Sequence, residues 1–429
     1  MWSELGFRDN PYSPRPIQAN EEGVELLVGR ESELRRLMTY IRSSDTHPTL
    51  EGPNGVGKTS LVSVAGYKLF REFVDKNGPA FIPIEPPFQL TSEDNLKNFK
   101  QKVLFSVAQN FVTHNQILKE KGYEIPHVDD INRWLNSPLF HLNGGGASIA
   151  GFGGNVTHST TPNSGTGFTE SGFVATIQAW LKSCFPSNTS GGFICLIDNL
   201  ELLETSKGAR ELLEAMRDEL LNIVGLRWVL CGARGIIRSS ASSPRLQGLL
   251  SDPIDVNPIN DVNAELALQK RLEIFSIKEA NAPVESDGFS HIYKIGNRNL
   301  RNSLKYCEDF AFWAYLSNSI PTNSKDKLDL IEVWMAEIAD KYEKDTSGVG
   351  NRAWKVFDDL IAEGGSASPS DYENFGYDSQ QSMRPQLKLL EDAHLIESAI
   401  DETDKRRRTI VVTSRGWIVH YKRSGFVTA

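Results

Sequence analysis

The segment GPNGVGKTS at residues 52–60 constrains this chain more than any other feature. It contains the full pattern of a phosphate-binding loop, in which two glycines separated by four residues precede Lys58 and Thr59. The glycines let backbone N–H groups face a phosphate, the lysine reaches the β- and γ-phosphates, and the hydroxyl is placed to hold Mg²⁺. The motif requires a strand before it and a helix after it, and residues 49–51 and 61–70 have those patterns. We therefore expect a nucleoside triphosphate site made by Gly52, Pro53, Asn54, Gly55, Val56, Gly57, Lys58, Thr59 and Ser60.

A phosphate-binding loop also needs a carboxylate at the end of a buried strand, which positions Mg²⁺ or its water shell. Asp198 fits this role because it directly follows the apolar run at residues 193–197. Ligands of open α/β sheets bind at the carboxyl ends of the strands. We therefore expect Thr59 and Asp198 to hold the metal. The alternative is that Asp198 and Asn199 only form a turn that ends the strand.

Length and composition limit the possible classes of protein. A chain of 429 residues is too long for one core and suggests two or three domains. No apolar run approaches the roughly 18–20 residues that a membrane-spanning helix needs, and the first residues lack the pattern of a signal peptide. We expect no membrane partner.

The four cysteines are scattered, so a structural zinc site is not expected. Cys195 and Cys231 lie in apolar runs typical of core strands, and a reducing, cytoplasmic location fits best. The net charge of −9 argues against a surface broadly adapted to nucleic acid, although it leaves room for one basic patch.

Strands alternate with helices through residues 26–257, after a proline-containing arm at 1–25. The apolar runs at 80–84, 193–197, 226–231 and 254–256 read as further strands, and the stretches 32–41, 95–111, 173–184 and 209–223 read as helices. This alternation predicts an α/β core with a mostly parallel sheet covered on both faces.

Residues 144–167 form a low-complexity insert rich in Gly, Ser and Thr. It reads as a flexible surface loop. Alternatively, it forms a hairpin that turns at residues 153–155 and touches a neighbouring subunit, nucleic acid or another partner.

The remaining chain divides into a helical part and a mixed part. Residues 258–344 read as an all-α lid, and residues 345–351 as a linker. Residues 352–429 read as three helices, the third at 382–392, followed by strands at 394–400 and 409–413 around the charged turn DETDKRRR. That order is typical of a winged helix.

Several motifs in this order resemble the AAA+ superfamily, and within it the origin-recognition/initiator branch and the related STAND signalling ATPases. They are VGRE, GPNGVGKTS, FICLIDNLE, VLCGARG, the passage from IDVNPIN to KRL, and the C-terminal winged helix. The resemblance implies an α/β P-loop NTPase core, an all-α lid and a winged helix that together bind ATP or ADP with Mg²⁺.

The resemblance also implies roles for single residues. Lys58 would serve the phosphates, and Thr59 and Asp198 would serve Mg²⁺. Arg234 looks like a sensor of the γ-phosphate, and Arg301 looks like the sensor of the lid. Either arginine could instead be an ordinary surface or ion-paired side chain. The arm at residues 11–17 would lie near the base.

One departure from the family concerns hydrolysis. Fast AAA+ enzymes resemble one another in having Glu directly after the strand-ending Asp, but this chain has Asn199. An amide orients water but takes no proton, and general-base catalysis contributes about 10²–10⁴-fold. We therefore predict slow hydrolysis, although Glu201 or Glu204 could substitute. Arg245 lies near the place of an arginine finger that acts on a neighbouring subunit, without the usual Ser-Arg after it, so a closed ring is not implied.

The winged helix offers two groups of basic residues for nucleic acid. The third helix carries Arg384 and Lys388, and the wing carries Lys405, Arg406, Arg407 and Arg408. Acids just before these cations leave open a solvated charged turn, and the winged helix could instead bind a protein or be purely structural. Two functions follow. The first is a switch that couples ATP to double-stranded DNA. The second is a STAND-like signalling or defence ATPase whose nucleotide state controls homo-oligomerisation or a protein effector.

Overall fold

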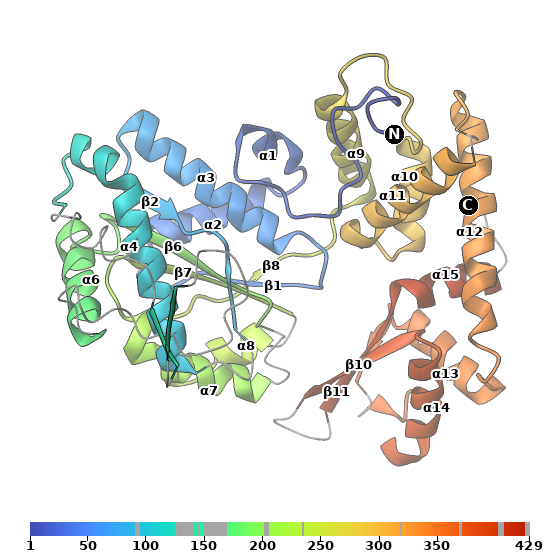
Figure 1. Cartoon of the computed structure of the whole chain (residues 1–429). Coiled ribbons are helices and arrows are strands. Elements are labelled where there is room, and N and C mark those ends of the chain that lie inside the picture. Colours follow the sequence, from blue (N-terminus) through green and yellow to red (C-terminus); the bar gives the residue numbers. More distant parts are fainter. Residues whose placement is uncertain are drawn as a thin grey trace.

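The computed structural model describes residues 1–90, 95–125, 128, 140–143, 146–149, 170–200, 206–233, 236–317, 320–368, 371–401 and 407–424. Figure 1 shows an α/β core on the left, a helical region at the upper right, and a smaller C-terminal region below the helical region.

The core contains a parallel sheet with strand order β2–β6–β7–β1–β8, and β3 also pairs with β6. Its strands are β1 (Thr49–Glu51), β2 (Ala80–Pro83), β3 (Phe88–Gln89), β6 (Gly191–Asp198), β7 (Leu226–Gly232) and β8 (Ile254–Asp255). Every residue of β6 and β7 is buried. Both faces of these strands are covered, so they read as continuous apolar runs. The predicted parallel sheet is confirmed.

Helices cover both faces of this sheet. One face carries α2 (Glu31–Ser43) and α3 (Lys58–Lys76), and the other carries α4 (Leu96–Glu120), α6 (Glu170–Cys184) and α7 (Ser206–Met216). The short helix α1 (Glu21–Leu26) packs against α3. Successive side chains of a strand alternate between faces, so Ile194 packs with the α2–α3 layer and Phe193 packs with the α4–α6 layer. The helix predicted at 209–223 is present at residues 206–221, where α7 passes directly into a π-helical turn, η3 (Arg217–Leu221). A short helix, α8 (Ile236–Ala241), follows β7.

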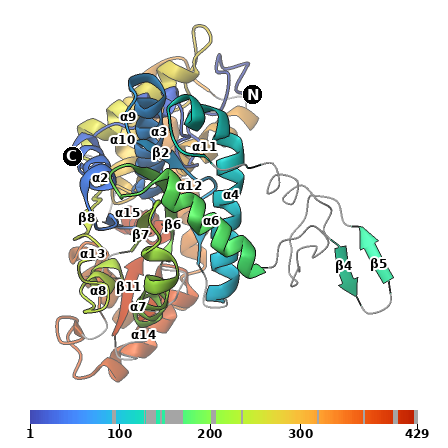
Figure 2. The same ribbon diagram turned by 90° about the vertical axis from the view of Figure 1, so that its left-hand side faces the viewer.

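A two-stranded hairpin lies beyond α4 in the chain. It pairs β4 (Phe140–Asn143) with β5 (Gly146–Ile149), and Figure 2 shows both strands standing apart from the core. For the insert at residues 144–167, a hairpin with its turn at residues 153–155 was the alternative to a flexible surface loop. The chain reverses earlier, between Asn143 and Gly146, and residues 153–155 lie outside the described residues.

Four helices form the helical region: α9 (Asp261–Phe275), α10 (Ser286–Ile295), α11 (Leu300–Leu316) and α12 (Ser324–Lys344). Three of them begin with an Asn side chain that accepts a bond from a backbone N–H of the first turn, at Asn260, Asn299 and Asn323. Their apolar faces form a cluster that also contains Tyr12 of the N-terminal arm, which is fully buried. The arm therefore packs on the helical region.

The C-terminal region combines helices with a small antiparallel sheet. Its elements are α13 (Asn351–Ala362), β9 (Ser366–Ala367), α14 (Gln380–Asp392), β10 (Ile396–Asp401), β11 (Arg407–Val412) and α15 (Ser414–Arg423). The strand order is β10–β11–β9. The described part of this region thus contains a helix, a strand, a second helix and a hairpin in this order, followed by α15.

Two features of this region differ from the sequence prediction. Among the described residues, β9 and a turn stand where the second of three helices was expected. Gly364 and Gly365 both have φ of 83°, which ends α13. Helix α15 was not predicted at all. In addition, the expected linker after α12 is a packed turn, because Thr346 and Val349 in it are buried.

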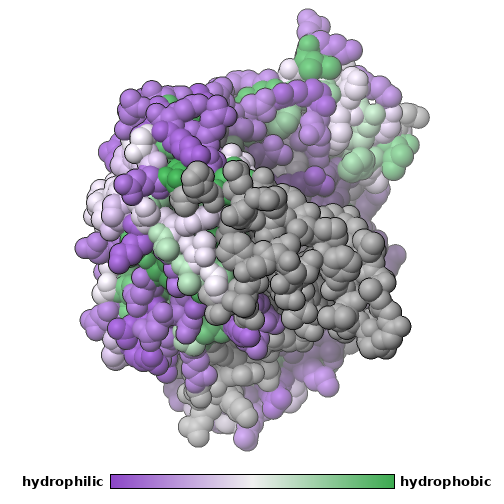
Figure 3. Space-filling model, turned by 60° about the vertical axis from the view of Figure 1, so that its left-hand side comes forward, coloured by the Kyte–Doolittle hydropathy of each residue, from purple (hydrophilic) through white to green (hydrophobic). Residues whose placement is uncertain are grey.

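The remaining features of the fold concern the apolar character of its helices and of its surface. None of the helices in the described part of the chain is long and apolar enough to cross a membrane. On the face shown in Figure 3, the coloured hydrophobic residues form small separate groups among hydrophilic ones.

Candidate nucleotide-binding site

The loop between β1 and α3 has the glycine geometry that a phosphate cradle requires. Gly55 and Gly57 have φ of 81° and 98°, a region that L side chains rarely adopt. Gly52 is needed for a different reason, because a Cβ at this position would lie 2.2 Å from the Val256 carbonyl oxygen. Helix α3 begins at Lys58 directly after Gly57, so its free N–H groups face the loop.

Lys58, Thr59 and Asp198 converge at the carboxyl edge of the sheet. The Thr59 hydroxyl donates to Asp198 Oδ2 at 2.7 Å. The Lys58 ammonium group donates to the carbonyl oxygens of Gly52 at 2.8 Å and Pro53 at 3.0 Å, within the loop itself. Lys58 and Asp198 are buried, with 5% and 7% of their surface exposed. The structure thus brings together three side chains that lie as far as 140 positions apart in sequence.

The donor set also fits Mg²⁺. Asp198 Oδ1 is buried and has no hydrogen-bond partner among the described residues. Burial of such an oxygen without a partner costs free energy, and a bound cation would remove that cost. Mg²⁺ prefers oxygen ligands and is commonly held by one or two protein oxygens together with substrate phosphates. Asp198 and the Thr59 hydroxyl supply oxygens of that kind.

The helical region closes over the loop through the start of α11. Asn299 Nδ2 donates to the Asn54 carbonyl oxygen at 2.8 Å, and the Arg301 backbone N–H donates to the Gly55 carbonyl oxygen at 3.2 Å. A Cβ at Gly55 would lie 2.4 Å from Asn299 Oδ1, so this glycine also permits the close approach. Arg301 lines the same pocket as Gly57 and Thr59.

The N-terminal arm forms another wall of this pocket. Residues 14–17 line it together with Leu26, Ile259 and Leu304, and the Ile17 backbone N–H donates to Ser60 Oγ at 3.0 Å. The buried Arg271 side chain also lines the pocket, and it donates to the Ser13 carbonyl oxygen at 3.1 Å. Burial lowers the pKa of Arg271 to about 10, so this side chain remains charged near neutral pH.

Arg30 links the loop to the start of the helical region. Its guanidinium group donates to the Val56 carbonyl oxygen at 2.9 Å and to the Asn257 carbonyl oxygen at 2.6 Å. Asn257 lies between β8 and α9, where the chain leaves the core. One buried side chain therefore joins the phosphate-binding loop to the connection between the core and the helical region.

The other expected site residues are placed as follows. Asn199 directly follows Asp198 and has φ of 57°. Arg245 lies 3.9 Å from Glu214 and 3.8 Å from Asp218, so it forms ion pairs within its own chain. Arg234, Glu201 and Glu204 lie outside the described residues.

The expected nucleic-acid residues lie away from this pocket, in the C-terminal region. Arg384 and Lys388 are exposed on α14. Arg407 and Arg408 are the first two residues of β11, and Lys405 and Arg406 lie outside the described residues.

Sequence reasoning missed Asn299, Arg271 and Arg30 as parts of this site. Asn299 carries a recognisable signal, because Asn directly before an apolar helical pattern predicts an N-cap. Its second bond, to Asn54, joins positions 245 apart and has no local signature. Arg30 and Arg271 lie within the VGRE and KRL motifs, but these motifs did not reveal their contacts, because the partners are backbone carbonyl oxygens.

The sequence matches no known protein-family model and no curated protein. Several solved structures are similar over nearly the whole chain. The Aeropyrum pernix ORC1 protein in complex with DNA has 14% identity and a TM-score of 0.46, with 98% of this chain and 97% of that chain covered. The Walker-type ATPase of Pyrococcus abyssi has 13% identity and a TM-score of 0.46, with 96% and 99% covered. At these identities and TM-scores, the similarity does not show what this chain binds or does.

The class of the protein follows from its own sheet and loop. The phosphate-binding loop follows β1, the carboxylate follows β6, one strand separates the two, and a helical region packs against the loop. The chain therefore has the α/β fold of a P-loop NTPase core, with a helical region packed against its phosphate-binding loop.

Proposed function

We propose that this protein is an ATP-binding, slowly hydrolysing molecular switch that couples its nucleotide state to DNA binding through the C-terminal winged helix. The observation that carries the nucleotide part is the bond between Thr59 and Asp198, beside a buried and unpartnered carboxylate oxygen. Asn299 and Arg301 of the helical region contact the same loop and pocket, which supports a coupling between bound nucleotide and this region.

Binding of ATP begins with the exchange of partners at Lys58. Its ammonium group leaves the carbonyl oxygens of Gly52 and Pro53 for the β- and γ-phosphate oxygens, and the N–H groups of the loop turn to the same phosphates. Thr59 and Asp198 would hold Mg²⁺, which neutralises charge on the phosphates when it is bound. The arm at residues 14–17 and Leu304 enclose the base.

The lid then responds to the γ-phosphate through Arg301. The Arg301 side chain lines the pocket, and its attraction to the terminal phosphate stabilises the closed lid only when ATP is bound. Arg30 transmits the same change of the loop to the connection at Asn257. Hydrolysis is slow because Asn199 orients water without accepting its proton.

The first test measures nucleotide binding and turnover. We expect Lys58→Ala to abolish ATP binding in calorimetry. We expect Asp198→Asn to bind ATP with little loss and to lose its Mg²⁺-dependent hydrolysis. Equal hydrolysis by Asp198→Asn would refute the role of this carboxylate. Turnover of tens per second by the unaltered chain would refute a slow switch.

The second test concerns DNA. The wing and α14 present cations that suit phosphate contacts, which give affinity without reading sequence. We expect ATP to increase retention of a DNA duplex and higher salt to weaken it steeply. Replacing Arg406, Arg407 and Arg408 with alanine should weaken retention across all sequences. Retention that is independent of salt and of these residues would exclude the DNA proposal.

A second candidate function is a STAND-like signalling or defence ATPase that controls oligomerisation or a protein partner. One contact favours it: Ile418 of α15 is fully buried in the core of the helical region, so the C-terminal region is held by the lid. Molecular mass in solution with ATP, ADP and no nucleotide separates the candidates. A change in assembly that needs no DNA favours the signalling ATPase.

A further inference from the structure

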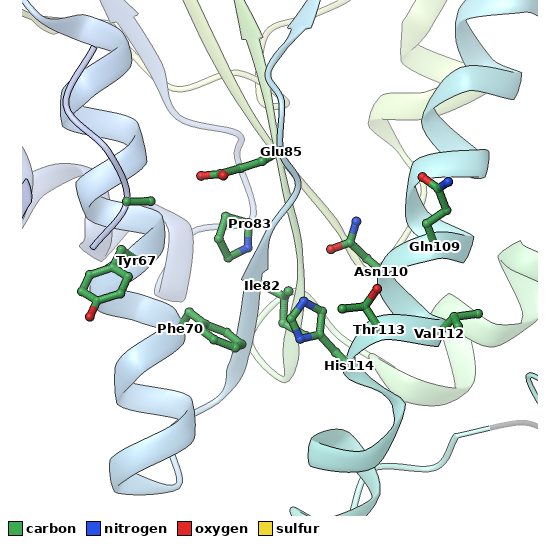
Figure 4. Close-up of a pocket in the computed structure, with 11 residues that line it drawn as sticks. Tyr67, Phe70, Ile82, Pro83, Glu85, Gln109, Asn110, Val112, Thr113 and His114 are labelled. Carbon is green, nitrogen blue, oxygen red and sulfur yellow. The ribbon is translucent and has the colours of Figure 1, made fainter. Parts of the chain in front are cut away.

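An open pocket of about 670 Å³ lies in the core, outside the nucleotide site. Figure 4 shows that the pocket lies along β2, between α3 and α4. Tyr67 and Phe70 of α3 are on one side, and Asn110, Thr113 and His114 of α4 are on the other. β2 is the edge strand of the sheet, so the pocket lies along a strand edge that no described strand covers.

The backbone along this edge offers acceptors rather than donors. The Ile84 N–H donates to Ile194 of β6, and alternate residues of a strand direct their backbone groups to opposite edges. The carbonyl oxygens of Phe81 and Pro83 therefore point to the free edge. Pro83 has no N–H, and the Phe81 N–H already donates to Pro79. An added β-strand would find too few donors, whereas a donor-rich ligand finds acceptors.

The side chains that line the pocket also offer acceptors and a negative charge rather than positive charge. The lining includes one carboxylate, Glu85, and no lysine or arginine. Among the described residues, no side-chain partner contacts the Glu85 carboxylate, the Tyr67 hydroxyl or the Thr113 hydroxyl. The Asn110 Nδ2 group already donates to the Ser106 carbonyl oxygen, which leaves its oxygen to accept.

Aromatic rings complete the pocket. Phe70 and His114 meet edge to face, with ring centroids 5.3 Å apart. Burial lowers the pKa of His114, so the imidazole is neutral near pH 7 and does not repel a cation. A cation over an aromatic face gains about 0.5–2 kcal/mol, and a planar guanidinium group both stacks and donates five hydrogen bonds.

We propose that this pocket binds an arginine side chain carried by an extended segment of a partner protein. Glu85 pairs with the guanidinium group, the rings of Tyr67 and Phe70 contact its faces, and the carbonyl oxygen of Pro83 accepts from it. The volume exceeds that of one side chain and admits the neighbouring peptide. Ala19 also lines the pocket, two residues beyond Ile17 of the nucleotide pocket, so the partner contacts the same arm as the nucleotide.

The test uses acetyl-Gly-Arg-Gly-amide as the probe, with the full chain and ligand-observed NMR. Citrulline has the same shape without the charge, so the citrulline peptide should bind at least about fivefold more weakly. Glu85→Gln should weaken binding of the arginine peptide by a similar factor, and Phe70→Leu should weaken it while keeping an apolar side chain. Glu120→Gln, at the exposed end of α4, is the matched control and should change nothing.

Folding of each variant is checked by its thermal melting and by its retained ATP binding, which the pocket residues do not contact. Equal binding of the arginine and citrulline peptides would overturn the proposal. So would undiminished binding to Glu85→Gln, or equal binding of a lysine peptide, since a lysine lacks the planar fork.

Discussion

Asn199 is the residue on which the rate of the proposed ATPase depends most directly. It follows Asp198, and its φ of 57° lies in the left-handed region, which Asn tolerates better than most residues. This conformation ends β6 and turns the chain away from the sheet. In the proposed mechanism, Asn199 is the side chain that orients the attacking water.

We predict that Asn199→Glu raises the rate of ATP hydrolysis by at least about tenfold, because a carboxylate accepts the proton that an amide cannot. The variant should also lose roughly 1 kcal/mol of stability, because Glu adopts the left-handed region less readily. Steady-state phosphate release measures the rate, and the double variant Asp198→Asn/Asn199→Glu is the inactive control. An unchanged rate would mean that water activation does not limit turnover.

Single residues also show where sequence reasoning stops. Lys58, Thr59 and Asp198 were predictable because a local pattern, a loop or a strand end, fixes each of them. Arg30 was not, since its bonds to Val56 and Asn257 depend on how the loop meets the lid connection. Contacts to backbone carbonyl oxygens leave no residue type to search for.

At the scale of elements, the connection between α2 and β1 carries a titratable group inside the core. His47 is buried, its Nε2 bonds the Leu221 carbonyl oxygen at 2.7 Å, and its Nδ1 accepts from the Trp228 N–H at 3.2 Å. Both bonds together require the neutral ring with its proton on Nε2. Burial lowers the pKa of His47 to about 4.

The pH dependence of stability follows from this shift. The unfolded chain binds a proton at His47 below about pH 6.5, whereas the folded chain does so only near pH 4. The folded state therefore loses stability as the pH falls from 6.5 to 4, and His47 accounts for about 2 kcal/mol of that loss by pH 4.5. Urea unfolding followed by tryptophan fluorescence measures it.

His47→Gln is the matched variant, because an amide can donate and accept but does not titrate. Its free energy of unfolding should fall less with acidification than that of the unaltered chain. Other histidines with a lowered pKa, including His114 and His420, remain in both proteins and cancel in the comparison. Equal slopes for the two proteins would contradict the assignment.

The elements themselves were predictable to different degrees. β6 and β7 were clear because parallel strands buried on both faces are continuous apolar runs. β9, with two residues, is too short to leave a pattern. α15 was missed because SRGWIVHYKR is amphipathic over only ten residues, and its apolar side includes Ile418, which packs on another region.

At the scale of the whole molecule, α15 joins the C-terminal region to the lid. Ile418 is buried in the lid core, and Tyr421 lies 3.0 Å from His291 and 3.1 Å from Glu332. Lys422 pairs with Asp340 and Glu343 of α12. Because core, lid and C-terminal region meet through such contacts, their relative placement was not predictable from separate motifs. The lid and the C-terminal region should move as one body when nucleotide closes the lid.

We predict that Ile418→Asp separates the two regions, because a charge placed in a buried apolar contact costs about 3 kcal/mol or more. Trypsin should then cleave after Lys344, where α12 meets the turn, at least roughly tenfold faster, since proteolysis follows the population of the open form. ATP binding at Lys58 should persist, while any effect of ATP on DNA retention should disappear. Leu389→Asp, on the exposed face of α14, is the control and should leave cleavage unchanged. Equal cleavage of Ile418→Asp and the unaltered chain would show that α15 does not hold the C-terminal region to the lid, and the switch would then need another route from nucleotide to DNA.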